Sequence, residues 1–185
     1  MQEVTINKVA RLSEHFTLGE MCKTSAKTAD GNIPSHVHIE NLKRLCGWLE
    51  KLRERYNRYY ARDQTPSSSP YSGGESCRRL PLLSRRGQGW SEEPIVINSG
   101  YRSEAVNKAV GGVKGSNHLT GCAADIKVTD IEQLIRYATI LLDISDESQE
   151  DFDELLLERS PKGSYWLHFA VRPSGNRRKI HLIQT

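Results

Sequence analysis

The most regular apolar pattern in the chain covers residues 34–56 and predicts one long amphipathic helix. Apolar side chains recur there at steps of three and four residues, and Pro34 suits the first turn of a helix. The apolar stripe consists of Ile39, Leu42, Leu45, Cys46, Leu49, Leu52 and Tyr56. His36 and His38 would point to different faces of this helix, so we expect surface residues rather than a metal pair.

The helical pattern disappears after this segment, and strands and shorter helices follow. Residues 57–93 are rich in Ser, Pro, Gly and Arg, and we expect a long loop or insertion there. Residues 95–97 then predict a short strand, and Ser103 can cap a helix that stops at Gly111. The remaining segments are a strand at 122–128, a helix at 130–143 and β-like runs at 153–158, 165–171 and 179–184. The core face of the second long helix is expected to carry Ile131, Leu134, Ile135, Ala138 and Leu141.

These segments predict an α+β fold in which helices flank a small antiparallel sheet with short turns. The 185 residues, of which 37% are hydrophobic, suffice for one core and are too few for two comfortable domains. We therefore expect a single domain over residues 1–185.

Charge and composition narrow the possible partners. The 26 basic residues are opposed by 23 acidic ones, giving a net charge of +3 without a sustained basic run. Nucleic-acid binding is therefore a weak alternative. Residues 77–86, CRRLPLLSRR, could form a basic contact patch, but charge in a solvated loop is the simpler interpretation.

Cysteine spacing and hydropathy argue against further classes of protein. Cys22, Cys46, Cys77 and Cys122 form no CxxC pair, so we expect reduced and mostly buried thiols rather than a zinc finger. Residues 1–20 lack the apolar core of a secretory signal, and no stretch approaches the roughly 18 apolar residues of a membrane helix. We expect a protein that is made in the cytoplasm and has no membrane partner.

One constellation of residues points to metal chemistry. His118 and Asp125 flank Gly121 in the segment SNHLTGCAAD, residues 116–125. If the chain turns at Gly121 and enters a strand, the imidazole and the carboxylate can converge on one point. His168 lies within an apolar strand, where a bare imidazole needs a partner, and it is the candidate third ligand. Two imidazoles and one carboxylate would hold Zn²⁺ with a fourth position open to water, as in catalytic zinc sites.

Three motifs resemble those of the M15 zinc peptidases, which cleave D-alanyl-D-alanine and related bonds in peptidoglycan. They are SGYRS at 99–103, SNHLTGCAAD at 116–125 with the pattern S-x-H-x-x-G-x-A-x-D, and WLH at 166–168. Weaker similarity at 12–21 and 152–158 extends the resemblance to most of the chain outside residues 57–93. The resemblance implies a hedgehog/D,D-peptidase-like fold, one zinc ion per chain and peptidoglycan stem peptides as the substrate. We expect a monomer.

The resemblance also implies roles for individual residues. His118, Asp125 and His168 would be the zinc ligands. Arg102 would pair with a terminal carboxylate of the substrate or steady the oxyanion that forms on attack. Ser116 would bind the substrate or support the loop that carries the first ligand.

The general base is expected in the segment FDELLLE, residues 152–158. Alternation along a strand places Glu154 and Glu158 on one face and Asp153 on the other. Glu158 matches the glutamate of the family's D-x-L-x-x-E strand, and we expect it to move a proton from the water to the leaving amine. Some relatives instead place a Glu or His three residues before the last ligand, where this chain has Tyr165.

Several alternatives stay open at this point. His181 and His15 are expected to be structural residues, the latter in local capping, and Trp166 is expected to pack in the core. A catalytically silent, zinc-containing module that binds peptidoglycan is a second possible function. The residues do not separate a carboxypeptidase from an endopeptidase. The expected substrate lies outside the cytoplasmic membrane, so release by a phage lysis system or a trimmed export signal would be needed.

Overall fold

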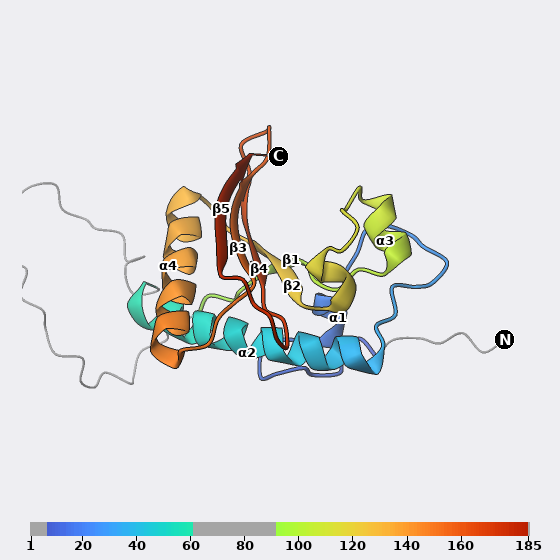
Figure 1. Ribbon diagram of the computed structural model, residues 1–185, viewed down its shortest axis with the longest axis horizontal. Coiled ribbons are helices and arrows are strands. Elements are labelled where there is room, and N and C mark those ends of the chain that lie inside the picture. The colour runs from blue at the N-terminus through green and yellow to red at the C-terminus, as the bar shows by residue number, and fades with distance from the viewer. Residues whose placement is uncertain (1–6, 61–91, 185) are drawn as a thin grey trace, which may run out of the picture.

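The computed structural model describes residues 7–60 and 92–184, and Figure 1 shows how their helices and strands are arranged. In chain order the elements are α1 (Leu18–Met21), α2 (His36–Tyr59), β1 (Ile97–Ser99), α3 (Glu104–Ala109), the 3₁₀ helix η1 (Asn117–Thr120), β2 (Ala123–Lys127), α4 (Ile131–Ser148), β3 (Glu154–Arg159), β4 (Tyr165–Ala170) and β5 (Lys179–Gln184). Most of the expected insertion, with Cys77 and the basic segment 77–86, lies outside the described residues.

The described strands form a five-stranded mixed sheet in the order β1-β2-β4-β3-β5. All neighbours pair antiparallel except β3 and β5, which are parallel. The prediction of an antiparallel sheet is therefore wrong for β5. The reason is that both edges of β4 are already occupied, by β2 and β3. The chain reverses after β4 and adds β5 at the outer edge of β3, and this makes the last pair parallel.

The helices α2 and α4 pack on one face of the sheet, where the core lies (Figure 1). The side chains of Leu155, Leu167 and Phe169 point to this face and are fully buried, and the Phe169 ring lies 5.4 Å from that of Trp48 in α2. Side chains of this kind contribute about 1.5–3 kcal/mol each when buried. The prediction of a single α+β domain is confirmed. Because side chains alternate along a strand, His168 points to the opposite face.

The long helix α2 is correctly predicted, but its ends differ from the prediction. Ser35 is its N-cap, so Pro34 precedes the cap rather than forming the first turn. The helix continues to Tyr59, so the first residues of the expected insertion are helical. Most of the predicted stripe is buried, whereas Ile39 is only partly buried. Trp48 joins the buried face because the core wraps around the side of the helix.

The helix α4 runs five residues beyond its predicted end at 143, to Ser148. Its predicted core face is only partly right, because Ile131 and Ile135 are 42% and 52% exposed. The buried residues are Leu134, Tyr137, Ala138, Ile140, Leu141, Ile144 and Ser145. The buried stripe is therefore rotated toward Tyr137, whose ring packs edge-on against Tyr56 of α2 at 4.8 Å.

The expectation of buried thiols is met by the cysteines that the structure describes. The three cysteines of the described residues, Cys22, Cys46 and Cys122, are free and buried. Burial raises the pKa of Cys22 and of Cys46 to about 12. Within residues 7–60 and 92–184, no helix is both long enough and apolar enough to cross a membrane.

Candidate metal centre

The three side chains predicted to bind metal converge on the face of the sheet opposite α2 and α4. Asp125 in β2 is paired directly with His168 in β4, and His118 lies in η1, just before β2. Each side chain offers one ligand atom, and these atoms lie within 4.8 Å of one another. We call these residues the His–Asp–His cluster.

Gly121 joins η1 to β2 and allows His118 and Asp125 to meet. Its φ of 71° lies in the left-handed region that favours glycine. A Cβ at this position would also lie 2.7 Å from the carbonyl oxygen of His38 and 3.3 Å from Cγ of Leu42. The turn therefore needs glycine both for its backbone conformation and for its close approach to α2.

Gly121→Ala is accordingly expected to lower the free energy of unfolding by more than the roughly 1–2 kcal/mol that a left-handed alanine costs. The matched control is Gly163→Ala, because Gly163 also has a positive φ, of 87°, while an added Cβ there meets nothing within 4 Å. Thermal unfolding followed by circular dichroism should show the larger decrease in Tm for Gly121→Ala. Equal decreases would contradict the argument from close approach.

Hydrogen bonds fix the orientation of both imidazole rings. Nδ1 of His118 lies 2.6 Å from the carbonyl oxygen of Gly100 and donates to it, so Nε2 is left as the free nitrogen. This Nε2 lies 3.2 Å from Oδ1 of Asp125. Nδ1 of His168 lies 2.9 Å from the same oxygen. One carboxylate oxygen thus faces one nitrogen from each ring.

The charges of the cluster stabilise one another in a nearly buried setting. Burial opposes ionisation of Asp125, but the hydrogen bonds and charges of His118 and His168 hold its pKa far below the ordinary value. Burial likewise opposes a charge on His168, but its hydrogen bond to Asp125 raises the pKa of His168 to about 9. Asp125 is therefore held as a carboxylate between the two imidazole rings.

The donor set fits a zinc ion. Two imidazole nitrogens and one carboxylate oxygen are the ligands of many catalytic zinc sites. In a tetrahedral site with bonds of roughly 2.0–2.1 Å, the ligand atoms lie about 3.3 Å from one another. The spacings of 3.2 and 2.9 Å between Oδ1 of Asp125 and the two nitrogens are close to this value.

Arg102 and Ser116 both support the cluster directly. Arg102 donates from Nη2 to Oδ2 of Asp125 at 2.5 Å and from Nε to the hydroxyl of Ser99 at 2.8 Å, and neither bond uses Nη1. Ser116 is the N-cap of η1, and its hydroxyl accepts a hydrogen bond from the backbone N–H of His118 at 3.3 Å. Ser116 therefore holds the turn that carries His118.

Glu158 lies on the same face of the sheet as the cluster, near the C-terminal end of β3. It is paired with Trp166, two residues before His168 in β4. Burial raises the pKa of Glu158 above its ordinary value, against the opposing charge of His168. A half-buried carboxyl group with a raised pKa, on the face of the sheet that carries the cluster, is suited to carry protons.

With this geometry established, comparison with known proteins gives a match for part of the chain. A family model described as Peptidase M15 matches residues 75–142. This matched segment of the chain is similar to the M15 peptidases. The matched segment contains Arg102, Ser116, His118 and Asp125, whereas His168 lies beyond it. A search of curated proteins found no match.

Sequence reasoning missed two residues beside the His–Asp–His cluster. Oε2 of Glu154 lies 3.7 Å from Nε2 of His168, on the opposite side of the ring from Asp125. Asn117 donates from Nδ2 to Oε2 of Glu154 at 3.0 Å and to Oδ2 of the fully buried Asp153 at 2.7 Å. The alternation of side chains along the strand did place Glu154 on this face of the sheet. The distance between Glu154 and His168, however, depends on the register of β3 against β4.

Three other expectations for single residues need correction. His181 is exposed on β5 rather than buried among apolar side chains. His15 makes no local cap: its Nδ1 lies 2.7 Å from Oε2 of Glu50 in α2, and Thr17 is the N-cap of α1. Trp166 is only half-buried, because it lies on the site face rather than the helix-covered face of the sheet.

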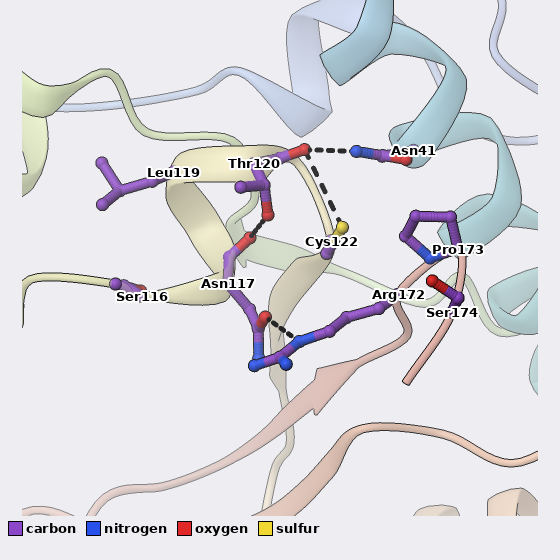
Figure 2. A pocket seen from close by; sticks show the side chains of 10 residues that line it. Asn41, Ser116, Asn117, Leu119, Thr120, Cys122, Arg172, Pro173 and Ser174 are labelled. Atoms are coloured by element: carbon purple, nitrogen blue, oxygen red, sulfur yellow. Dashed lines mark hydrogen bonds between the residues drawn. The ribbon is translucent and has the colours of Figure 1, made fainter. Parts of the chain in front are cut away.

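A pocket of about 350 Å³ lies beside η1 and is shown in Figure 2. Its walls come from α2, η1 and the segment after β4, and among the described residues its lining includes no member of the His–Asp–His cluster. The polar groups there largely satisfy one another: Asn41 donates to the carbonyl of Thr120 at 2.9 Å, and Arg172 donates to Oδ1 of Asn117 at 2.9 Å. We therefore interpret the residues that line this pocket as structural support for η1.

Proposed function

We propose that the protein is a zinc-dependent peptidase that hydrolyses D-Ala-D-Ala-type bonds in the stem peptides of peptidoglycan. The observation that carries the proposal is the convergence of His118, Asp125 and His168 within 4.8 Å, in a chain of which part is similar to the M15 peptidases. Similarity to the M15 peptidases supports peptide hydrolysis. The bond that is cleaved and the substrate are our additions. The three residues of the cluster would hold one zinc ion per chain.

A zinc ion in the cluster would supply an acidified water as the nucleophile and would polarise the scissile carbonyl. Proton transfer falls to the protein, and two glutamates on this face of the sheet are the candidates. The nearby His168 imidazole lowers the pKa of Glu154 to about 2, whereas burial raises that of Glu158. Glu158 is therefore the better proton carrier, and we assign it the role of general base and, for the leaving amine, general acid.

Arg102 would contribute in two ways. Its bond to Oδ2 of Asp125 holds that carboxylate with Oδ1 facing the two imidazoles. Its Nη1, which neither of its two bonds uses, would pair with a substrate carboxylate or with the oxyanion. Ser116 would act by capping η1 and so keeping His118 in place.

The proposal is tested with purified muropeptides that end in D-Ala-D-Ala. The protein is incubated with them before and after treatment with a chelator, and the products are identified by mass spectrometry. We expect release of D-Ala or of cross-link fragments, loss of this activity with the chelator, and recovery when zinc is added back. Hydrolysis that resists complete removal of metal would contradict the proposal.

The products also separate the remaining alternatives. Release of terminal D-Ala identifies a carboxypeptidase, and release of cross-link fragments identifies an endopeptidase. Zinc that binds with no turnover of any muropeptide would favour the non-catalytic peptidoglycan-binding module.

A further inference from the structure

We propose that Glu154 is a positioning residue for the metal ligand His168. It would hold the Nε2 side of the imidazole so that Nδ1 faces the metal. This inference rests on the proposed zinc site and extends it to a residue outside the ligand set.

The two nitrogens of His168 face two different carboxylates. Nδ1 lies 2.9 Å from Oδ1 of Asp125, and Nε2 lies 3.7 Å from Oε2 of Glu154. When the ring is neutral, only one nitrogen carries a proton. A carboxylate at Nε2 favours the proton there, which leaves the lone pair of Nδ1 for a metal. Carboxylates placed in this way behind metal-binding histidines orient the ring and raise its basicity.

Glu154 is itself fixed by three donors from two parts of the chain. Asn117 donates to Oε2 at 3.0 Å, Arg177 donates to Oε1 at 2.9 Å, and Lys179 lies 3.5 Å from Oε1. The side chain of Glu154 is only 16% exposed. Because both oxygens are engaged, the carboxylate cannot rotate freely away from His168.

The same network reaches the other imidazole. Asn117 directly precedes His118, and its amide nitrogen bridges Glu154 and Asp153. Asp153 also accepts from Arg177 at 2.8 Å (Oδ1) and 2.7 Å (Oδ2), so one arginine clamps both carboxylates. The network thus links the start of β3 and the segment before β5 to η1 and β4, the elements that carry the two histidines.

The position of Glu154 argues against a direct role in proton transfer. It lies on the Nε2 side of His168, whereas the cluster is assembled on the Nδ1 side. Glu154 would therefore act through His168, and its removal should weaken metal binding before it alters chemistry. Loss of such an outer partner typically costs about 10–100-fold in metal affinity.

The test compares zinc dissociation constants for the wild-type protein, Glu154→Gln and Glu154→Leu, measured by competition with a chromogenic chelator. We expect about 10-fold weaker binding for Glu154→Gln, which keeps an acceptor but loses the charge, and about 100-fold weaker binding for Glu154→Leu. In the Co²⁺-substituted proteins, the visible absorption bands should shift in both variants. The matched control is Glu147→Gln, which removes a carboxylate paired with Arg55 on the helices and should change neither readout.

The outcomes separate this inference from the proposed function. A wild-type protein that binds no zinc would overturn both. A wild-type protein that binds one zinc, with Glu154 variants within twofold of it and unshifted Co²⁺ bands, would overturn the inference alone. If both Glu154 variants fail to fold, Lys179→Met provides the test, because it removes one anchor of Glu154 without touching His168. It should weaken zinc binding and shift the Co²⁺ bands, and unchanged values would refute the inference.

Discussion

His118→Ala is expected to abolish zinc binding and to reduce muropeptide hydrolysis by at least about 10³-fold, because the nucleophile loses its activation. His118 is 3% exposed, and its ring is held by Gly100 and aimed at Asp125, so the substitution removes one of three converging donors. Zinc content by elemental analysis and initial rates by mass spectrometry measure the two effects. Asp125→Asn, which keeps the shape of the side chain, should give the same losses with less disturbance of packing.

The matched control for this prediction is His181→Ala. Leu156 of β3 is paired with both His168 and His181, so the two histidines lie in one row across the sheet. His181 is exposed and lies outside the His–Asp–His cluster, so its loss should leave zinc content unchanged. Full activity in His118→Ala, in a variant with a native circular dichroism spectrum, would show that the cluster is not the active site.

Glu158→Gln is expected to lower kcat by about 10²–10⁴-fold while one zinc per chain is retained, because a proton carrier is lost and no ligand is removed. This result differs from that expected for His118→Ala, which loses zinc, and from that expected for Glu154→Gln, which binds zinc more weakly. Parallel measurement of kcat and zinc content separates the three variants. The Glu147→Gln variant again serves as the control for removal of a carboxylate.

Wild-type rates in a folded, zinc-loaded Glu158→Gln protein would place the general base elsewhere. They would also remove the main argument that distinguishes the roles of Glu158 and Glu154. Wild-type protein that binds zinc and muropeptides, with no turnover in it or in the variant, would instead indicate the non-catalytic module.

The convergence of His118 and Asp125 could be predicted from sequence because its geometry is mostly local. Gly121 marks the turn between His118 and Asp125, and the left-handed φ at Gly121 is what brings the two together. His168 could be added because an imidazole within an apolar strand needs a polar partner. Its partner in the structure is Asp125, across the β2–β4 pair.

Features that depend on pairing between distant segments could not be predicted from the sequence in this way. The parallel pairing of β5 follows from the occupied edges of β4, which no residue within 179–184 reveals. The contact of Glu154 with His168 requires the register of two strands and the anchoring of Glu154 by Arg177 from beyond β4. The rotation of the buried face of α4 toward Tyr137 depends on its packing against Tyr56 of α2.

The central claim is that one zinc ion binds between His118, Asp125 and His168. The most direct measurement is a crystal structure of the zinc-loaded protein with anomalous diffraction data collected on both sides of the zinc absorption edge. We expect one strong anomalous peak per chain, bonded to Nε2 of His118, a carboxylate oxygen of Asp125 and Nδ1 of His168. The absence of a peak at this cluster, or a zinc ion bound only elsewhere in the chain, would contradict the claim.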